Sequence, residues 1–207
     1  QALPALLDGD GETLAAVRAL DGDVDDLHEA VILYLRSLGL KSLSSGEAAD
    51  MVRLMRTADY VEQIGDLVET DMVELGYVRL SKQVTVSEET RSTLITLHAL
   101  TDEAIRLALL ALVRGEKELA EQVMTLKAEV DEKARIATDR VASRLTADSP
   151  GRLASYRLET QLIERLKRIF YFAKRIAKEV ADRSESAGPD SGVREPKAVD
   201  PAAGTDA

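Results

Sequence analysis

Apolar side chains recur at alternating steps of three and four residues through most of this chain, and this spacing decides what kind of fold it can form. Side chains three or four positions apart lie on one face of an α-helix, so each run makes a continuous packing stripe. A first run is formed by Val17, Leu20, Val24, Leu27, Val31, Tyr34 and Leu38, and a second by Leu54, Ala58, Val61, Gly65, Val68, Met72 and Leu75. The pattern predicts an all-α fold of long packed helices.

Turn residues divide the chain into five predicted long helices. We expect one helix over 8–38, then a turn rich in Ser and Gly, and an antiparallel second helix up to about residue 80. A polar, β-branched stretch over 81–87 interrupts the pattern, and further helices are expected over 88–113, 116–145 and 152–183 with turns at Gly115 and Ser149–Gly151. Gly, Pro, Ser and Asp dominate from residue 184, which predicts a disordered tail over 184–207.

The chain repeats itself weakly. Residues 9–25 can be laid on 115–131, which aligns Gly9 with Gly115 and Asp25 with Asp131. The repeat predicts tandem antiparallel three-helix bundles, with a partial first repeat over 1–80 and a second repeat over 81–183. Leu3, Leu6 and Leu7 are spaced like the last turn of a helix begun upstream, so we expect the first helix of the first repeat to be truncated in a fragment of a longer protein.

Composition excludes several classes of function. There is no cysteine, so thiol nucleophiles and zinc-thiolate sites are ruled out. The net charge of -10 opposes general nucleic-acid binding, which needs clustered Lys and Arg. No apolar run approaches the roughly 18 residues of a membrane-spanning helix, and neither a phosphate-binding glycine loop nor a nucleophile triad is present. We therefore expect no enzymatic activity.

Two pairs of acidic residues carry the candidate site. Asp21 and Asp25 are four residues apart, as are Glu62 and Asp66, so each pair shares one helix face. In an antiparallel hairpin the two pairs are nearly level, beside the apolar stripe, and Gly65 in the stripe would allow the helices a close approach. Four carboxylates repel one another unless a cation intervenes, and oxygen ligands suit iron, manganese, magnesium or calcium. The alternative is an ordinary solvated acidic face.

The second repeat offers a comparison within the chain. Its equivalent positions pair Lys127 with Asp131 and Glu164 with Arg168, which gives two acids and two bases. Ion pairing could there take the place of a metal ion, so only the first repeat is expected to hold one.

The segment Ala58 to Thr70, which contains Glu62-Gln63-Ile64-Gly65-Asp66, resembles the signature helix of PhoU-like proteins, and Asp21 to His28 resembles the acidic helix that precedes it. The sequence of these segments is most similar to that of the domain that follows bacterial sodium/phosphate cotransporters. The resemblance covers about residues 8–183. It implies tandem three-helix bundles, regulation of phosphate uptake, and metal ligation by Asp21, Asp25, Glu62 and Asp66. Lys127 and Arg168 depart from the family's acidic pattern in the second half.

The resemblance also implies partners and a location. We expect the transmembrane transporter domain of the same chain as partner, a possible homodimer, no nucleic acid and no small-molecule substrate, in a cytoplasmic domain of an inner-membrane protein. A free-standing PhoU-like regulator and a metal-independent helical interaction scaffold are the alternatives. Nine bases against four acids over 152–183 would suit an anionic surface or the transporter, and one of Phe170, Tyr171 and Phe172 must point away from the core.

Overall fold

The computed structural model describes residues 1–145 and 151–186, and every regular element in these ranges is helical. The all-α prediction is confirmed. None of the helices in these ranges has the length and apolarity needed to cross a membrane. The elements, in chain order, are α1 (Ala2–Asp8), α2 (Gly11–Arg18), α3 (Asp21–Gly39), α4 (Ser45–Asp66), the π-helix η1 (Leu67–Met72), α5 (Val73–Ser81), α6 (Glu88–Arg114), α7 (Lys117–Leu145) and α8 (Arg152–Ser186).

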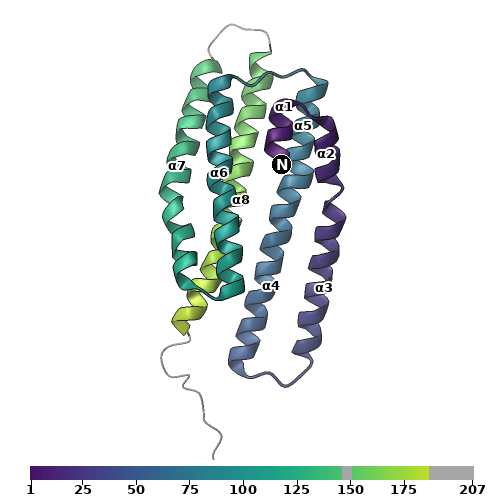
Figure 1. The fold of residues 1–207 in the computed structure, drawn as a ribbon, viewed down its shortest axis with the longest axis vertical. Helices are drawn as coiled ribbons and strands as arrows, with labels where there is room; N and C mark the ends of the chain where they lie inside the picture. Colours follow the sequence, from purple (N-terminus) through teal and green to yellow (C-terminus); the bar gives the residue numbers. More distant parts are fainter. Residues whose placement is uncertain (146–150, 187–207) are drawn as a thin grey trace, which may run out of the picture.

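Helices α6, α7 and α8 lie side by side and form the better-packed half of the molecule (Figure 1). Ser87 caps the start of α6 by accepting a hydrogen bond from the amide of Thr90, and Gly115 ends it in the left-handed conformation at φ 67°. Small side chains such as Ala120, Ala134 and Ala137 face inward from α7, which lets the three helices approach closely. The predicted helices over 88–113, 116–145 and 152–183 are confirmed.

The predicted helical turn at Leu3, Leu6 and Leu7 is confirmed by α1, but the single predicted helix over 8–38 is wrong. Gly9 adopts φ 76° and ends α1, and Asp10 then caps α2 by accepting hydrogen bonds from the amides of Glu12 and Thr13. A second break follows Arg18, where the amide of Leu20 bonds the carbonyl of Val17 in a tightened turn. Helices α2 and α3 nevertheless follow one another in the same direction (Figure 1). The break therefore bends the predicted helix without reversing the chain.

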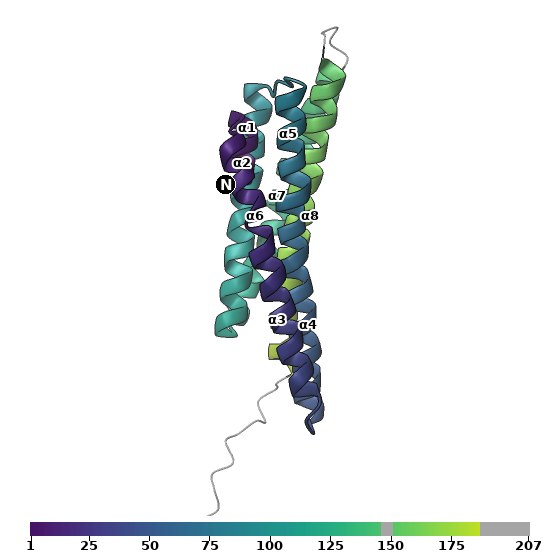
Figure 2. The same cartoon turned by 90° about the vertical axis from the view of Figure 1, so that its right-hand side faces the viewer.

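The predicted second helix is also interrupted. It starts with a capping box, in which Ser44 and Glu47 exchange hydrogen bonds, and it ends at Ser81 as the polar stretch predicts. Between α4 and α5, however, the backbone widens into the π-helix η1. The chain continues in one direction through all three elements (Figure 2), so the π-turn rotates the side chains that follow relative to those of α4.

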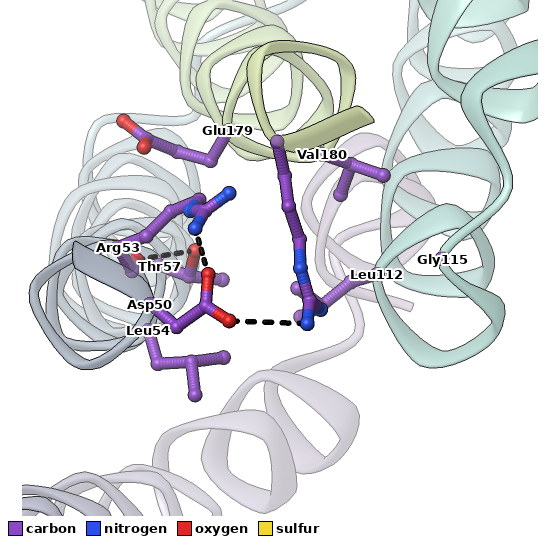
Figure 3. A pocket seen from close by; sticks show the side chains of 9 residues that line it. Asp50, Arg53, Leu54, Thr57, Leu112, Gly115, Glu179 and Val180 are labelled. Carbon is purple, nitrogen blue, oxygen red and sulfur yellow. Dashed lines mark hydrogen bonds and ion pairs between the residues drawn. The ribbon is translucent and has the colours of Figure 1, made fainter. Parts of the chain in front are cut away.

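The α3–α4 hairpin is loosely packed and extends past the ends of α6 and α7 (Figures 1 and 2). Only Leu35 of α3 and only Thr57 of α4 are buried. The hairpin is attached to the other half through contacts of α4 with α8, where the Asp50 carboxylate pairs with Arg183 of α8 as well as with Arg53 of its own helix (Figure 3). These contacts hold the acidic first half against the basic eighth helix.

A second attachment lies nearer the middle of α8. The hydroxyl of Tyr60 accepts hydrogen bonds from Arg175 at 2.7 and 3.1 Å, and its ring stacks on Phe172 at 6.0 Å. Of the three consecutive aromatic residues, Phe170 and Phe172 are buried and Tyr171 is 48% exposed, which confirms that one must point outward.

The end of the chain partly departs from the prediction. Helix α8 continues to Ser186, so the expectation of disorder is wrong for 184–186. The rest of the predicted tail, 187–207, and the first two residues of the predicted turn at Ser149–Gly151 lie outside the described residues.

Candidate functional site

The structure places the four predicted acidic residues where α3 begins and α4 ends. Asp21 opens α3 and Asp25 follows one turn later, while Glu62 and Asp66 occupy the last two turns of α4. Because the two helices pack against each other in opposite directions, the beginning of one lies beside the end of the other (Figure 1). Asp21 also lies in the first turn of its helix, where the macrodipole favours negative charge.

Gly65 lets these two helices approach closely at the acidic residues. A Cβ added at Gly65 would lie 3.1 Å from Cγ1 of Val24 on α3, a distance at which the valine would have to give way. The predicted role of this glycine in the packing stripe is confirmed.

The four carboxylates share one electrostatic environment. Partial removal from water raises the pKa of Asp21, and the negative charges of Glu69, Asp25 and Asp66 raise it further, against a smaller opposing effect of Arg18. The pKa of Glu62 is likewise raised by desolvation first and then by Asp66 and Asp25, among others. Asp21 and Glu62 therefore each experience the charges of Asp25 and Asp66.

Glu69 is a fifth acidic residue of this region, and it was missing from the predicted set. It lies in η1, has a side chain only 12% exposed, and its Oε1 is 3.3 Å from Nε of Arg18. Its spacing of seven residues from Glu62 continues the acidic stripe of α4, which is a signal that the sequence contains.

The acidic residues are close enough to interact but are not gathered into a ligand shell. Among the residues of 1–145 and 151–186, no group of three or more His, Asp or Glu side chains is arranged to hold a metal ion. His28, one turn after Asp25, instead pairs with Asp59 at 3.0 Å between Nε2 and Oδ1.

At the equivalent positions of the second half, the charged side chains have other partners than in the first half. Lys127 and Asp131 form an ion pair at 2.6 Å, as predicted, whereas Glu164 pairs with Lys167 at 3.0 Å. Arg168 lies over the ring of Phe172, with 5.9 Å from its Cζ to the ring centre, and it lines a pocket of about 300 Å³ together with Asp66 and Thr70. A base of the second half thus lines the same pocket as an acid of the first.

Comparison with known proteins agrees with this architecture. The PhoU domain family model matches residues 1–71 and 94–180. The crystal structure of PhoU from Pseudomonas aeruginosa superposes with a TM-score of 0.82 at 18% sequence identity, over 89% of this chain and 87% of that one. The phosphate transport system regulatory protein PhoU from Streptococcus pneumoniae superposes with a TM-score of 0.76 at 15% identity, over 89% and 85%. No curated protein matches the chain.

Proposed function

Because this chain belongs to the PhoU domain family, we propose that it is a regulator of phosphate transport. The observation that carries the proposal is the family match over both halves of the chain, together with a fold shared with PhoU along most of its length. Those solved structures are of PhoU proteins, which supports a PhoU-type regulator better than the predicted domain of a sodium/phosphate cotransporter. A catalytic role is not part of the proposal.

Deleting the coding region from its host and measuring the uptake of labelled phosphate tests this function. We expect uptake that no longer falls when external phosphate is plentiful, and restoration by the reintroduced gene. Uptake that responds normally in the deletion strain would contradict the regulatory role.

A bound cation is the second element of the proposal. Asp21, Asp25, Glu62 and Asp66 offer only oxygen ligands, and each of the two carboxyls with a raised pKa experiences repulsion from others of the set. A hard or borderline cation such as iron, manganese, magnesium or calcium would relieve that repulsion. Because the side chains are not gathered at ligand distance, binding would require them to rotate toward a common centre.

Elemental mass spectrometry of the untagged protein tests the cation directly. We expect a stoichiometric metal that is lost in Glu62→Ala/Asp66→Ala and kept in the matched second-half variant Asp131→Ala/Glu164→Ala. A cation present at a hundred times its Kd stabilises the folded state by about 2.7 kcal/mol, which corresponds to a rise in Tm of roughly 5–11 °C for a domain of this size. Metal absent from the wild type after reconstitution, or equally lost in both variants, would refute the site.

A further inference from the structure

A pocket of about 490 Å³ lies between α7 and α8, on a surface that the proposed function does not use. Every residue of its lining belongs to one of these two helices. The lining has an apolar part, Met124, Tyr171 and Ala181, and a charged part, Lys127, Lys174, Arg175, Lys178 and Asp182. The volume is within the range of small-molecule pockets, about 300–1,000 Å³.

Most of the positive charge of this pocket has no carboxylate partner. Within 1–145 and 151–186, neither Lys174 nor Lys178 forms an ion pair, and the Lys174 ammonium lies 5.9 Å from the centre of the Tyr171 ring. Arg175 donates its hydrogen bonds to the hydroxyl of Tyr60, which is uncharged. In the part of the chain that the structure describes, three positive charges of the pocket are therefore outside any ion pair, and they would attract an anion.

The internal repeat shows that the two halves differ in charge at this place. Lys127 of the pocket corresponds to Asp21, one of the four carboxylates of the candidate cation site, and Met124 corresponds to Arg18. Lys127 has a carboxylate partner, because it pairs with Asp131 at 2.6 Å. The first half therefore presents acids that suit a cation, whereas the corresponding region of the second half presents bases that suit an anion.

The combination of apolar and basic side chains narrows the class of anion. A free inorganic phosphate would contact the lysines and leave the ring of Tyr171, which is 48% exposed, without a partner. A flat lipid surface would contact the rim of the pocket and leave its interior empty. Nucleic-acid bases stack favourably on aromatic side chains, and lysine ammonium groups attract phosphoryl groups. A molecule that joins a planar ring to phosphoryl groups would contact both parts of the lining.

We propose that the pocket between α7 and α8 binds a nucleoside phosphate. The base packs against Tyr171 and Met124, and the phosphoryl groups lie among Lys174, Arg175 and Lys178. This binding depends neither on the role in phosphate transport nor on a cation at the acidic residues of the first half.

Isothermal titration calorimetry on the full chain tests the proposal with probes that separate the ring from the charge. The probes are ATP, adenosine, tripolyphosphate and vesicles of anionic phospholipid. EDTA in the buffer keeps a cation at the acidic residues of the first half from holding the phosphoryl groups. The pocket variants are Lys174→Gln/Lys178→Gln and Tyr171→Ala. The matched control is Lys41→Gln/Lys82→Gln, which removes two exposed lysines outside the pocket.

We expect ATP to bind at least about tenfold more tightly than either adenosine or tripolyphosphate, a difference of roughly 1.4 kcal/mol. Lys174→Gln/Lys178→Gln should weaken ATP binding by about tenfold or more, because two of the attracting charges are lost. Tyr171→Ala should weaken ATP binding by about fivefold or more and leave tripolyphosphate unchanged, because it removes the ring on which the base stacks. The control variant should bind ATP like the wild type, and circular dichroism should show that all three variants fold.

Four results would overturn the proposal. The wild type could fail to bind ATP at millimolar concentration. Tripolyphosphate that binds as tightly as ATP, with no effect of Tyr171→Ala on either, would show that the pocket attracts charge alone. A loss of ATP binding in Lys41→Gln/Lys82→Gln as large as in Lys174→Gln/Lys178→Gln would mean that the net charge of the chain decides it. Anionic vesicles that bind more tightly than ATP and displace it would assign the surface to a membrane.

Discussion

Gly76 of α5 permits a close contact with Leu14 of α2, and replacing this glycine with alanine tests how much that contact contributes to stability. An added Cβ would lie 2.5 Å from Cδ1 and 3.0 Å from Cδ2 of Leu14. Carbon atoms pack at about 3.5–4.0 Å, so the leucine would have to retreat by roughly 1 Å. Leu14 is fully buried, which leaves it little room to do so.

Overpacking costs about 1–3 kcal/mol, and a 2.5 Å contact with a fully buried leucine belongs in the upper half of that range. Alanine returns about 0.5–1 kcal/mol because it favours the helix over glycine. We therefore expect Gly76→Ala to lower the free energy of unfolding by about 1–2.5 kcal/mol. Urea denaturation followed by circular dichroism measures this. Gly22→Ala is the control, because an added Cβ there meets nothing within 4 Å, and it should match or exceed the wild type.

A Gly76→Ala protein as stable as the wild type would refute this reasoning, since it would show that α2 and α5 separate at no cost. A double-mutant cycle makes the test sharper. Leu14→Val removes bulk at the point of contact, so it should cost less stability in the Gly76→Ala background than in the wild type. Costs that simply add would locate the destabilisation elsewhere.

Two further predictions concern side chains that interact with or within α8. Tyr60→Phe keeps the ring on Phe172 but leaves Arg175 without its hydroxyl acceptor, so urea denaturation should show a loss of about 1–2 kcal/mol; an unchanged midpoint would mean that water replaces the hydroxyl. Glu159 is fully buried, with Oε2 3.9 Å from Nη2 of Arg152, and Glu159→Ala should cost about 3 kcal/mol because it leaves buried cationic charge unpaired. Burial raises the pKa of this carboxyl against the opposing effect of Arg152 and Arg144, so the folded state holds more protons than the unfolded state between the ordinary and the raised pKa. The free energy of unfolding of the wild type should therefore fall as pH rises across that interval. If its dependence on pH were the same in Glu159→Ala, another group would be the cause of that dependence.

Most of the helical architecture was predictable because apolar periodicity and local capping act over a few residues. The glycine at residue 115, which ends α6, and the Ser44–Glu47 pair, which forms the capping box of α4, can both be recognised in the sequence. The break at Gly9 and Asp10 also had local signals, a glycine that ends one helix and an aspartate that starts the next. The predicted helical turn at Leu3, Leu6 and Leu7 anticipated the end of α1, whereas the unbroken apolar stripe from Val17 to Leu38 hid the break after Arg18.

Other features had no local signal. Neither glycine nor proline marks the turn at Ala19 and Leu20 or the π-helix over Leu67–Met72, so these depend on how α2 and α5 pack in three dimensions. The π-helix in turn places Glu69 beside Asp21 and Arg18. Regular helical spacing predicted the two acidic pairs, and the same spacing, seven residues from Glu62, is the signal that could have identified Glu69 as a fifth acidic residue.

Glu62 connects the two surfaces of the hairpin. Its carboxyl belongs to the acidic set and also lines an apolar groove along α3 and α4. A cation bound at Glu62 would therefore change the charge of the groove wall as well as that of the acidic set.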